Sequence, residues 1–307
     1  MKLGYSYGQV SGFSAANAAF LAYRFEKKTG FKSGKGESWA CALRKDDLLC
    51  RLYGKDFWLT GLWYSREGDA WVCGSHGELT VLHDVQAEVP ETASDTVELG
   101  HAWMGIWGLN QKHVIAWGDQ DQSDGVMARF DGKKWSEMPS PFHGVMAVHG
   151  VAPDLIFAVG TKGRIARWNG KAWKAATSPT STTLTAVHVV SPDEIYACGS
   201  GRHLLEGSVH GWADTLEAEW PLSAVAKWKG DVWVAATKGG LAKLAGGSLQ
   251  IVKPNVEAQD LDARKDLMIG CPLKIVATED GEQFFGYAKD FILESLEDKP
   301  PMWITRA

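Results

Sequence analysis

Short apolar runs recur along the chain at nearly constant spacing. Four of them end in glycine, namely DAWVCG (69–74), HVIAWG (113–118), LIFAVG (155–160) and EIYACG (194–199). Their closing glycines are separated by 44, 42 and 39 residues. The runs DVWVAAT (231–237) and DLMIGC (266–271) continue the series in degenerate form, and SWACAL (38–43) begins it. We therefore predict seven copies of one structural unit.

Each copy contains further strand-like segments around its apolar run. A short apolar segment precedes the run, as in VMAVHG (145–150), and two more segments joined by a tight turn follow it, most clearly in RIARWNGKAWKAAT (164–177). Asn-Gly, Asp-Gly and Gly-Gly pairs at such turns favour hairpins, because their backbone angles need positive φ. No helical period separates the copies. A unit of four short strands in about 40 residues is typical of a β-propeller blade.

The predicted fold is therefore all-β, a seven-bladed β-propeller of four-stranded antiparallel blades, with six or eight blades as alternatives. We expect one domain over 1–307, with clear repeats at 38–288 and with 1–37 and 289–307 involved in closing the ring, since an open ring leaves unpaired strand edges. Only six copies show a clear first strand, so the seventh must come from a terminus. The candidates are AFLAYRF (19–25) and PMWITR (301–306). Residues 14–30 could instead form a helix that Ser14 caps and Gly30 ends.

The segment from Ala147 to Trp173 resembles a Trp-rich repeat of bacterial β-propellers, grouped with photosystem-assembly-factor-like and sialidase-like propellers. The resemblance covers about residues 38–288 and implies the fold rather than a function. Residues 278–285 also resemble the Asp-box turn of sialidase-like blades, with Glu282 in place of glycine and Phe284 in place of threonine. Because that motif is a structural turn, it does not imply glycosidase activity.

The repeat explains the unusual content of 15 Trp and 34 Gly. The glycines mark strand ends and turns, and most tryptophans fall at repeated positions where a wedge between blades needs bulk. The segment after the last turn of a copy carries Trp135, Trp173 and Trp212. The second strand carries Trp39, Trp71 and Trp233, and the first strand carries Trp63 and Trp107. Outside the repeated positions are Trp103, Trp220 and Trp303, which we interpret as available for other roles.

Charge and cysteine content narrow the class of protein. With 32 Lys+Arg against 37 Asp+Glu, the chain lacks the basic excess of a nucleic-acid-binding protein. No apolar run is long enough to span a membrane. The five cysteines are odd in number and include no CxxC pair, which argues against a disulfide framework and against zinc. Because the N-terminal apolar run is broken by polar residues, we expect no signal peptide and a reduced, cytoplasmic protein.

The chain shows no catalytic motif: GxSxG, HExxH and a phosphate-binding loop are all absent. We therefore expect no catalytic residue and no cofactor. His149 and His188 occupy the repeat position of Trp63 and Trp107, so we interpret them as packed or hydrogen-bonded.

One acidic loop departs from the repeat. Residues 118–125 contain Asp119, Asp121 and Asp124, a weak candidate site for Ca²⁺. The spacing differs by one residue from the DxDxDG pattern and no bidentate Glu follows. We therefore favour a solvated or partner-contacting acidic loop.

The loops between second and third strands and the connections between blades share one rim of a propeller. Here they combine charged and aromatic residues, a mixture that suits a protein partner. The predicted partner-binding rim consists of His76, His101, Trp103, Asp119, Asp121, Asp124, His143, Lys162, Arg164, Arg202, His203, Trp220 and Lys238. Our hypothesis is a non-catalytic protein-binding propeller, most specifically a bacterial immunity or inhibitor protein that binds and neutralises a toxin. The alternative is a carbohydrate-active propeller (glycosidase or lyase) or a glycan-binding one.

Overall fold

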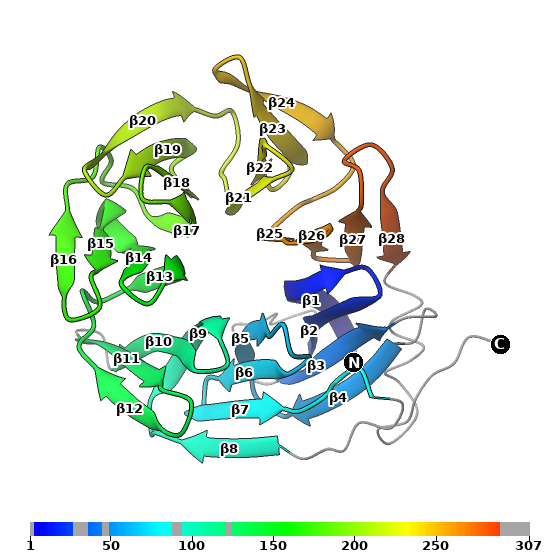
Figure 1. Ribbon diagram of the computed structural model, residues 1–307. Helices are drawn as coiled ribbons and strands as arrows, with labels where there is room; N and C mark the ends of the chain where they lie inside the picture. Colours follow the sequence, from blue (N-terminus) through cyan, green and yellow to red (C-terminus); the bar gives the residue numbers. More distant parts are fainter. Residues whose placement is uncertain (1–2, 27–35, 45–48, 88–93, 121–123, 289–307) are drawn as a thin grey trace. The chain divides into compact units, whose positions relative to one another are not determined.

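A computed structural model describes residues 3–26, 36–44, 49–87, 94–120 and 124–288. Their strands form seven four-stranded antiparallel sheets (Figure 1), with Thr161–Gly163 as a 3₁₀ turn. The prediction of a seven-bladed β-propeller is thus confirmed, and the alternatives of six and eight blades are wrong. Among the described residues, no helix is long and apolar enough to cross a membrane.

The chain divides into two compact units, residues 1–103 with 260–307 (unit 1) and residues 104–259 (unit 2). Blades 1, 2 and 7 belong to unit 1. Their strands are β1 (Leu3–Ser14), β2 (Asn17–Glu26), β3 (Gly36–Arg44) and β4 (Leu49–Lys55); β5 (Leu59–Tyr64), β6 (Ala70–Gly74), β7 (Glu78–Leu82) and β8 (Ser94–Glu98); β25 (Asp260–Ala263), β26 (Leu267–Cys271), β27 (Lys274–Thr278) and β28 (Phe285–Ala288).

Blade 3 begins at the end of unit 1, and blades 4, 5 and 6 lie in unit 2. The strands are β9 (Ala102–Asn110), β10 (His113–Gln120), β11 (Asp124–Phe130) and β12 (Trp135–Met138); β13 (Val145–Ala152), β14 (Leu155–Gly160), β15 (Ile165–Trp168) and β16 (Trp173–Ala176); β17 (Leu184–Ser191), β18 (Glu194–Gly199), β19 (His203–Ser208) and β20 (Gly211–Glu217); β21 (Ala224–Trp228), β22 (Asp231–Ala235), β23 (Leu241–Ala245) and β24 (Ser248–Lys253).

In blade 1, each predicted strand lies one position later in the blade than expected. Residues 19–25 lie in β2, the second strand, and residues 38–43 lie in β3, the third strand, so Trp39 is not in a second strand. The helix alternative is wrong where the structure describes it, since residues 17–26 form β2. The first strand, β1, was missed because its glycines and serines hide the alternation of a strand. The other candidate for closure, 301–306, lies outside the described residues.

Blades 1 and 7 are joined by polar contacts, and each is built from consecutive strands. Three carboxylates of blade 7 accept hydrogen bonds from backbone N–H groups of β1 and the following turn: Asp260 from Val10 (2.9 Å), Asp262 from Gly12 (3.0 Å) and Asp266 from Ala15 (3.2 Å). The Tyr7 N–H donates to the Pro272 carbonyl at 2.9 Å. These bonds satisfy three N–H groups of β1, and none of the described strands is exchanged between the two blades.

The hydrophobic core is divided among the spaces between neighbouring blades. Between blades 1 and 7, Phe20 and Cys41 pack with Met268 and Ile275. Between blades 3 and 4, the buried Trp117 and Trp168 belong to one cluster. Of the repeated tryptophans, Trp39 belongs to the first of these clusters, and Trp107 and Trp173 pack against the second, which supports their assignment to packing between blades.

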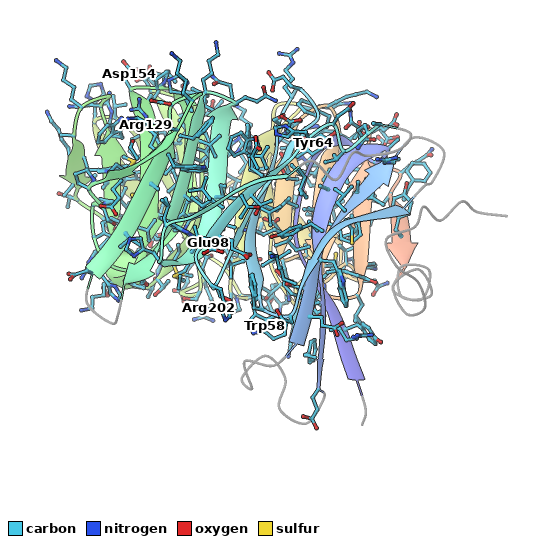
Figure 2. All side chains as sticks on the ribbon, turned by 90° about the horizontal axis from the view of Figure 1, so that it is seen from below. Trp58, Tyr64, Glu98, Arg129, Asp154 and Arg202 are labelled. Carbon is cyan, nitrogen blue, oxygen red and sulfur yellow. The ribbon has the colours of Figure 1, made fainter. Side chains whose placement is uncertain are left out.

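The strands of each blade run between two opposite ends, which we call the edges of the blade and which carry different connections. The turn from second to third strand and the link to the next blade lie at one edge, which we call the connection edge. The other two turns lie at the opposite edge, the hairpin edge. Within unit 2, Figure 2 shows Arg129 and Asp154 at the hairpin edge and Arg202 at the connection edge. Within unit 1, it shows Tyr64 at the hairpin edge and Trp58 at the connection edge.

Candidate partner-binding surface

At the connection edge of blades 3 and 4, Asp119 supports the link between the blades. Its Oδ1 accepts a hydrogen bond from the Gly144 N–H (3.1 Å) and lies 3.1 Å from Nδ1 of His143. Asp124 is exposed and pairs with Gln120 across the β10–β11 hairpin, while Asp121 lies outside the described residues. Among the residues that the structure describes, no three His, Cys, Asp or Glu side chains lie together as a metal site. The Ca²⁺ interpretation therefore stays a prediction from sequence.

Two cations of the blade 4 turn differ in what they contact. The Arg164 guanidinium donates to the His143 carbonyl (3.2 Å) and lies 5.8 Å from the ring centre of Phe142, so it is used within the fold. Lys162 has a φ of 60° and an exposed side chain. Its ammonium makes no ion pair among the described residues. Lys162 is the one of the two that can meet a partner.

The blade 5 turn carries two surface pairs. Arg202 is exposed, and its guanidinium lies 2.6 Å from a Glu217 carboxylate oxygen. Nδ1 of His203 lies 2.7 Å from Oδ2 of Asp214. Because the Arg202–Glu217 pair is exposed and such pairs contribute little to stability, its charges remain available for exchange with a partner's charges.

Trp220 forms a fixed aromatic surface on the link between blades 5 and 6. The half-buried ring lies on Gly239, where an added Cβ would come within 2.5 Å of Trp220 Cδ2. The neighbouring Lys238 is exposed. The Thr237 hydroxyl donates to the Pro221 carbonyl (3.2 Å) and fixes the turn beside the ring. This rigid aromatic residue beside an exposed cation is the part of the predicted rim that most resembles an interface anchor.

In unit 1 the predicted rim residues divide into exposed and buried ones. His76 is exposed, with its ring centre 4.4 Å from that of Phe57. Trp103 is 1% exposed, and its indole N–H donates to the Gly77 carbonyl at 3.0 Å. The ring of His101 packs edge-on against Trp103 at 5.8 Å. Trp103 therefore holds the blade 2 turn and has no surface to offer a partner.

A second aromatic group at the connection edge of blade 1 was missed by sequence reasoning. The half-buried rings of Phe25, Tyr23 and Trp58 lie against Gly4, Gly8 and Gly36, where an added Cβ would come within 2.6, 2.7 and 2.1 Å of them. Tyr23 also donates its hydroxyl to the Leu59 carbonyl at 2.9 Å. The signal was present as glycines spaced along residues 4–12. It became interpretable only once β1 was known to pair with β2.

The histidines and cysteines behave as packed groups. Nδ1 of His149 accepts a hydrogen bond from the Val189 N–H at 3.0 Å, and its ring stacks on that of His188 at 4.7 Å. The hydrogen-bonded interpretation of His149 is thus confirmed. Burial raises the pKa of the Cys73 thiol to about 12 and raises that of Cys198 as well. A catalytic cysteine needs the opposite shift, so neither thiol is an activated nucleophile.

The Asp-box-like turn of blade 7 uses its carboxylate internally. Asp280 Oδ1 accepts hydrogen bonds from the N–H groups of Glu282 and Gln283, both at 2.8 Å. These bonds lower the pKa of the Asp280 carboxyl. The interpretation of this segment as a structural turn matches the contacts.

Comparison with known proteins gives one curated relative of interest. No family model matches the chain. The protein described as "Immune protein Tsi7" of Pseudomonas aeruginosa is 27% identical over 177 residues, which cover 52% of this chain and 56% of that protein. The chain thus spans little more than half the length of this relative.

Several solved structures share the fold. The WD40 β-propeller domain of Doa1 aligns with a TM-score of 0.66 at 14% identity, covering 88% of this chain and 91% of that one. Sqt1 of Chaetomium thermophilum aligns with a TM-score of 0.60 at 10% identity, covering 89% and 82%. YCF48 bound to D1 peptide aligns with a TM-score of 0.55 at 14% identity, covering 74% and 80%. At these identities the similarities show that the chain is a β-propeller, and they show no more than the fold.

Proposed function

We propose that this protein is a non-catalytic immunity protein that binds a toxin polypeptide through the connection edge and neutralises it. The observation that carries the proposal is the similarity to the immune protein of Pseudomonas aeruginosa, which extends over 177 residues. YCF48, a propeller of similar fold, is bound to a peptide in its solved structure, which is a precedent for this kind of partner.

The connection edge of unit 2 supplies suitable contact groups. Lys162, Arg202 and Lys238 are exposed, and Trp220 is held rigid on Gly239. Tryptophan and arginine are enriched among residues that dominate binding energy, especially where an aromatic ring is pre-organised. Exposed carboxylates stand among the cations, including Asp124 and Glu217. The surface therefore favours a partner with mixed charge and a pocket for an aromatic ring.

The test is co-expression with proteins encoded beside this gene. We expect one of them to inhibit growth when expressed alone, and this chain to restore growth and to form a stoichiometric complex in gel filtration and calorimetry. The double variant Trp220→Ala/Lys238→Glu should bind at least about 30-fold more weakly, because it removes a proposed anchor and reverses a neighbouring charge. The control is Asp193→Lys, an exposed residue at the hairpin edge of blade 5.

Two results would count against the proposal at different levels. If no neighbouring gene product is toxic and bound, the immunity function is wrong. If growth is restored equally by the wild type and by Trp220→Ala/Lys238→Glu, the function stands and the assigned surface is wrong. The Asp-box-like turn lends the carbohydrate-active alternative no support, because its Asp280 carboxylate is used within the turn.

A further inference from the structure

The hairpin edge of blades 3 and 4 carries a concentration of positive charge. The basic hairpin patch consists of Lys112, Arg129, Lys133, Lys134, Lys171 and Lys174. The five lysines are exposed and Arg129 is half-exposed. None of the six makes an ion pair with another described residue. This is notable in a chain whose acidic residues outnumber its Lys and Arg by 37 to 32.

Rigid turns hold the lysines of this patch. Asn110 Oδ1 accepts the Lys112 N–H at 2.9 Å, and Asn169 Oδ1 accepts the Lys171 N–H at 3.0 Å. Asp131 Oδ1 accepts the N–H groups of Lys133 and Lys134 at 2.9 and 3.0 Å. In all three turns a side-chain oxygen fixes the backbone that carries a lysine. Pre-organised turns of this kind reduce the entropy lost when a partner binds.

Contacts between the turns make the patch continuous within each blade, and packing joins the two blades. An added Cβ at Gly132 would lie 2.9 Å from Lys112 Cγ, so the two hairpins of blade 3 touch. An added Cβ at Gly170 would lie 3.2 Å from Asp154 Cβ, so those of blade 4 touch as well. The blades pack through one buried cluster that includes Ile115 and Ile156. Figure 2 shows Arg129 of blade 3 and Asp154 of blade 4 at the same edge.

The electrostatic effect of the patch is visible on a neighbouring group. Burial lowers the pKa of His113, and the positive charges of Arg129 and Lys112 lower it further. The Asp131 carboxylate, which accepts hydrogen bonds from the N–H groups of Lys133 and Lys134, keeps its negative charge and offsets only part of the six positive charges. The field at this edge therefore favours a negatively charged partner.

We infer that the basic hairpin patch is a second interaction surface, separate from the connection edge, and that it binds an acidic polypeptide segment. A polypeptide fits better than a nucleic acid for two reasons. First, Asp131 and Asp154 lie in or beside the turns that carry the lysines, and these carboxylates suit a partner with spaced carboxylates better than a continuous phosphate backbone. Second, the half-buried Trp135 and Trp173 rings pack on Phe130 and Trp168, with centres 5.6 and 5.5 Å apart, instead of forming open stacking platforms for bases.

The inference is tested by fluorescence anisotropy with the full chain and three probes: a labelled oligoglutamate peptide, an oligoglutamine peptide of equal length, and a short DNA duplex. We expect the oligoglutamate peptide to bind most tightly. Its affinity should fall at least about tenfold between about 50 and about 200 mM salt, because the contacts are exposed charge pairs.

Two double variants locate the binding site. Lys133→Glu/Lys171→Glu should weaken oligoglutamate binding at least about tenfold. Lys229→Glu/Lys265→Glu changes the net charge equally at exposed hairpin turns of blades 6 and 7 and should leave binding within about twofold. Circular dichroism checks that both variants are folded. Absence of oligoglutamate binding, tighter binding of DNA, or equal losses in the two double variants would each overturn the inference.

Discussion

The polar junction between blades 1 and 7 allows a quantitative prediction. Asp262 is the residue to change, because its carboxylate connects three groups. Oδ2 accepts hydrogen bonds from the Ser11 hydroxyl (2.8 Å) and the Gly12 N–H (3.0 Å), and the Arg264 guanidinium lies 3.0 Å from the same oxygen. The side chains of Asp262 and Arg264 are only 18% and 19% exposed. Water can therefore replace the lost contacts only in part.

The expected magnitude follows from these contacts. Removing one member of a largely buried ion pair costs about 3–5 kcal/mol, because the remaining charge is left without its partner. Part of that cost is offset here, since Arg264 still donates to the Tyr64 carbonyl at 2.7 Å and to Ser11 Oγ at 3.0 Å. We expect Asp262→Ala to lower the free energy of unfolding by about 3 kcal/mol. Asp262→Asn keeps an acceptor oxygen, so its loss should be about 1–2 kcal/mol.

Urea unfolding followed by circular dichroism and tryptophan fluorescence measures both losses. Glu67→Ala is the matched control, because Glu67 is exposed on the β5–β6 hairpin of the same unit and should change stability by less than about 0.5 kcal/mol. If unit 1 unfolds in a separate transition, only that transition should move. A loss below about 1 kcal/mol for Asp262→Ala, or an equal loss for Asn and Ala, would refute the reasoning.

Three further predictions concern a carboxyl, two glycines and the thiols. Burial raises the pKa of Asp260 to about 6, above its value in the unfolded chain. Protonation of Asp260 therefore stabilises the fold below about pH 4, and this contribution is lost as the pH rises through 6. Asp260→Asn should flatten the dependence of the unfolding free energy on pH between about pH 4 and 7, and equal pH profiles for the variant and the wild type would contradict this. Gly163→Ala should lower the free energy of unfolding by at least about 2 kcal/mol, since φ is +68° and the new Cβ would lie 2.0 Å from the Thr180 carbonyl oxygen. In Gly211→Ala the new Cβ meets no atom within 4 Å, so this control should be neutral or stabilising. Thermal melts of the two variants measure the difference. In a Cys50→Ser variant, the four remaining cysteines are buried, so Ellman's reagent should titrate them only after denaturation, and fast reaction of the native protein would argue against this packing.

Much of the fold was readable because a repeated unit imposes the same physical needs in every copy. The predicted second strands of blades 2, 4 and 5 end at Gly74, Gly160 and Gly199 as expected, and that of blade 3 continues past Gly118 to Gln120. Blade 1 was misread because β2 and β3 are buried on both faces, so they show apolar runs without alternation, while β1 is rich in glycine. The repeat pattern did not identify β1, because the residues of β1 fit its contacts with blade 7 and do not recur in the other copies.

The candidate surface was less predictable than the fold. Sequence position placed Lys162, Lys238 and Trp220 correctly on loops, but it could not distinguish them from Trp103, which is buried under its own turn. Burial depends on how neighbouring turns pack, and a single-chain pattern does not contain that information. The basic hairpin patch was hidden for a similar reason, because its lysines come from turns that are far apart in sequence and unremarkable singly.

The junction of blades 1 and 7 also has a consequence for the order of folding. Ser11 and Asp262 are 251 residues apart, so their contact cannot form until the segment that contains Asp262 has left the ribosome. Unit 2 is synthesised between the two parts of unit 1 and can fold while β1 still lacks its neighbour. Contacts of such long range are slow to form, because a large loop must close first. Blade 7 thus completes the contacts of blade 1, and β1 is exposed to proteases and mispairing until blade 7 has formed.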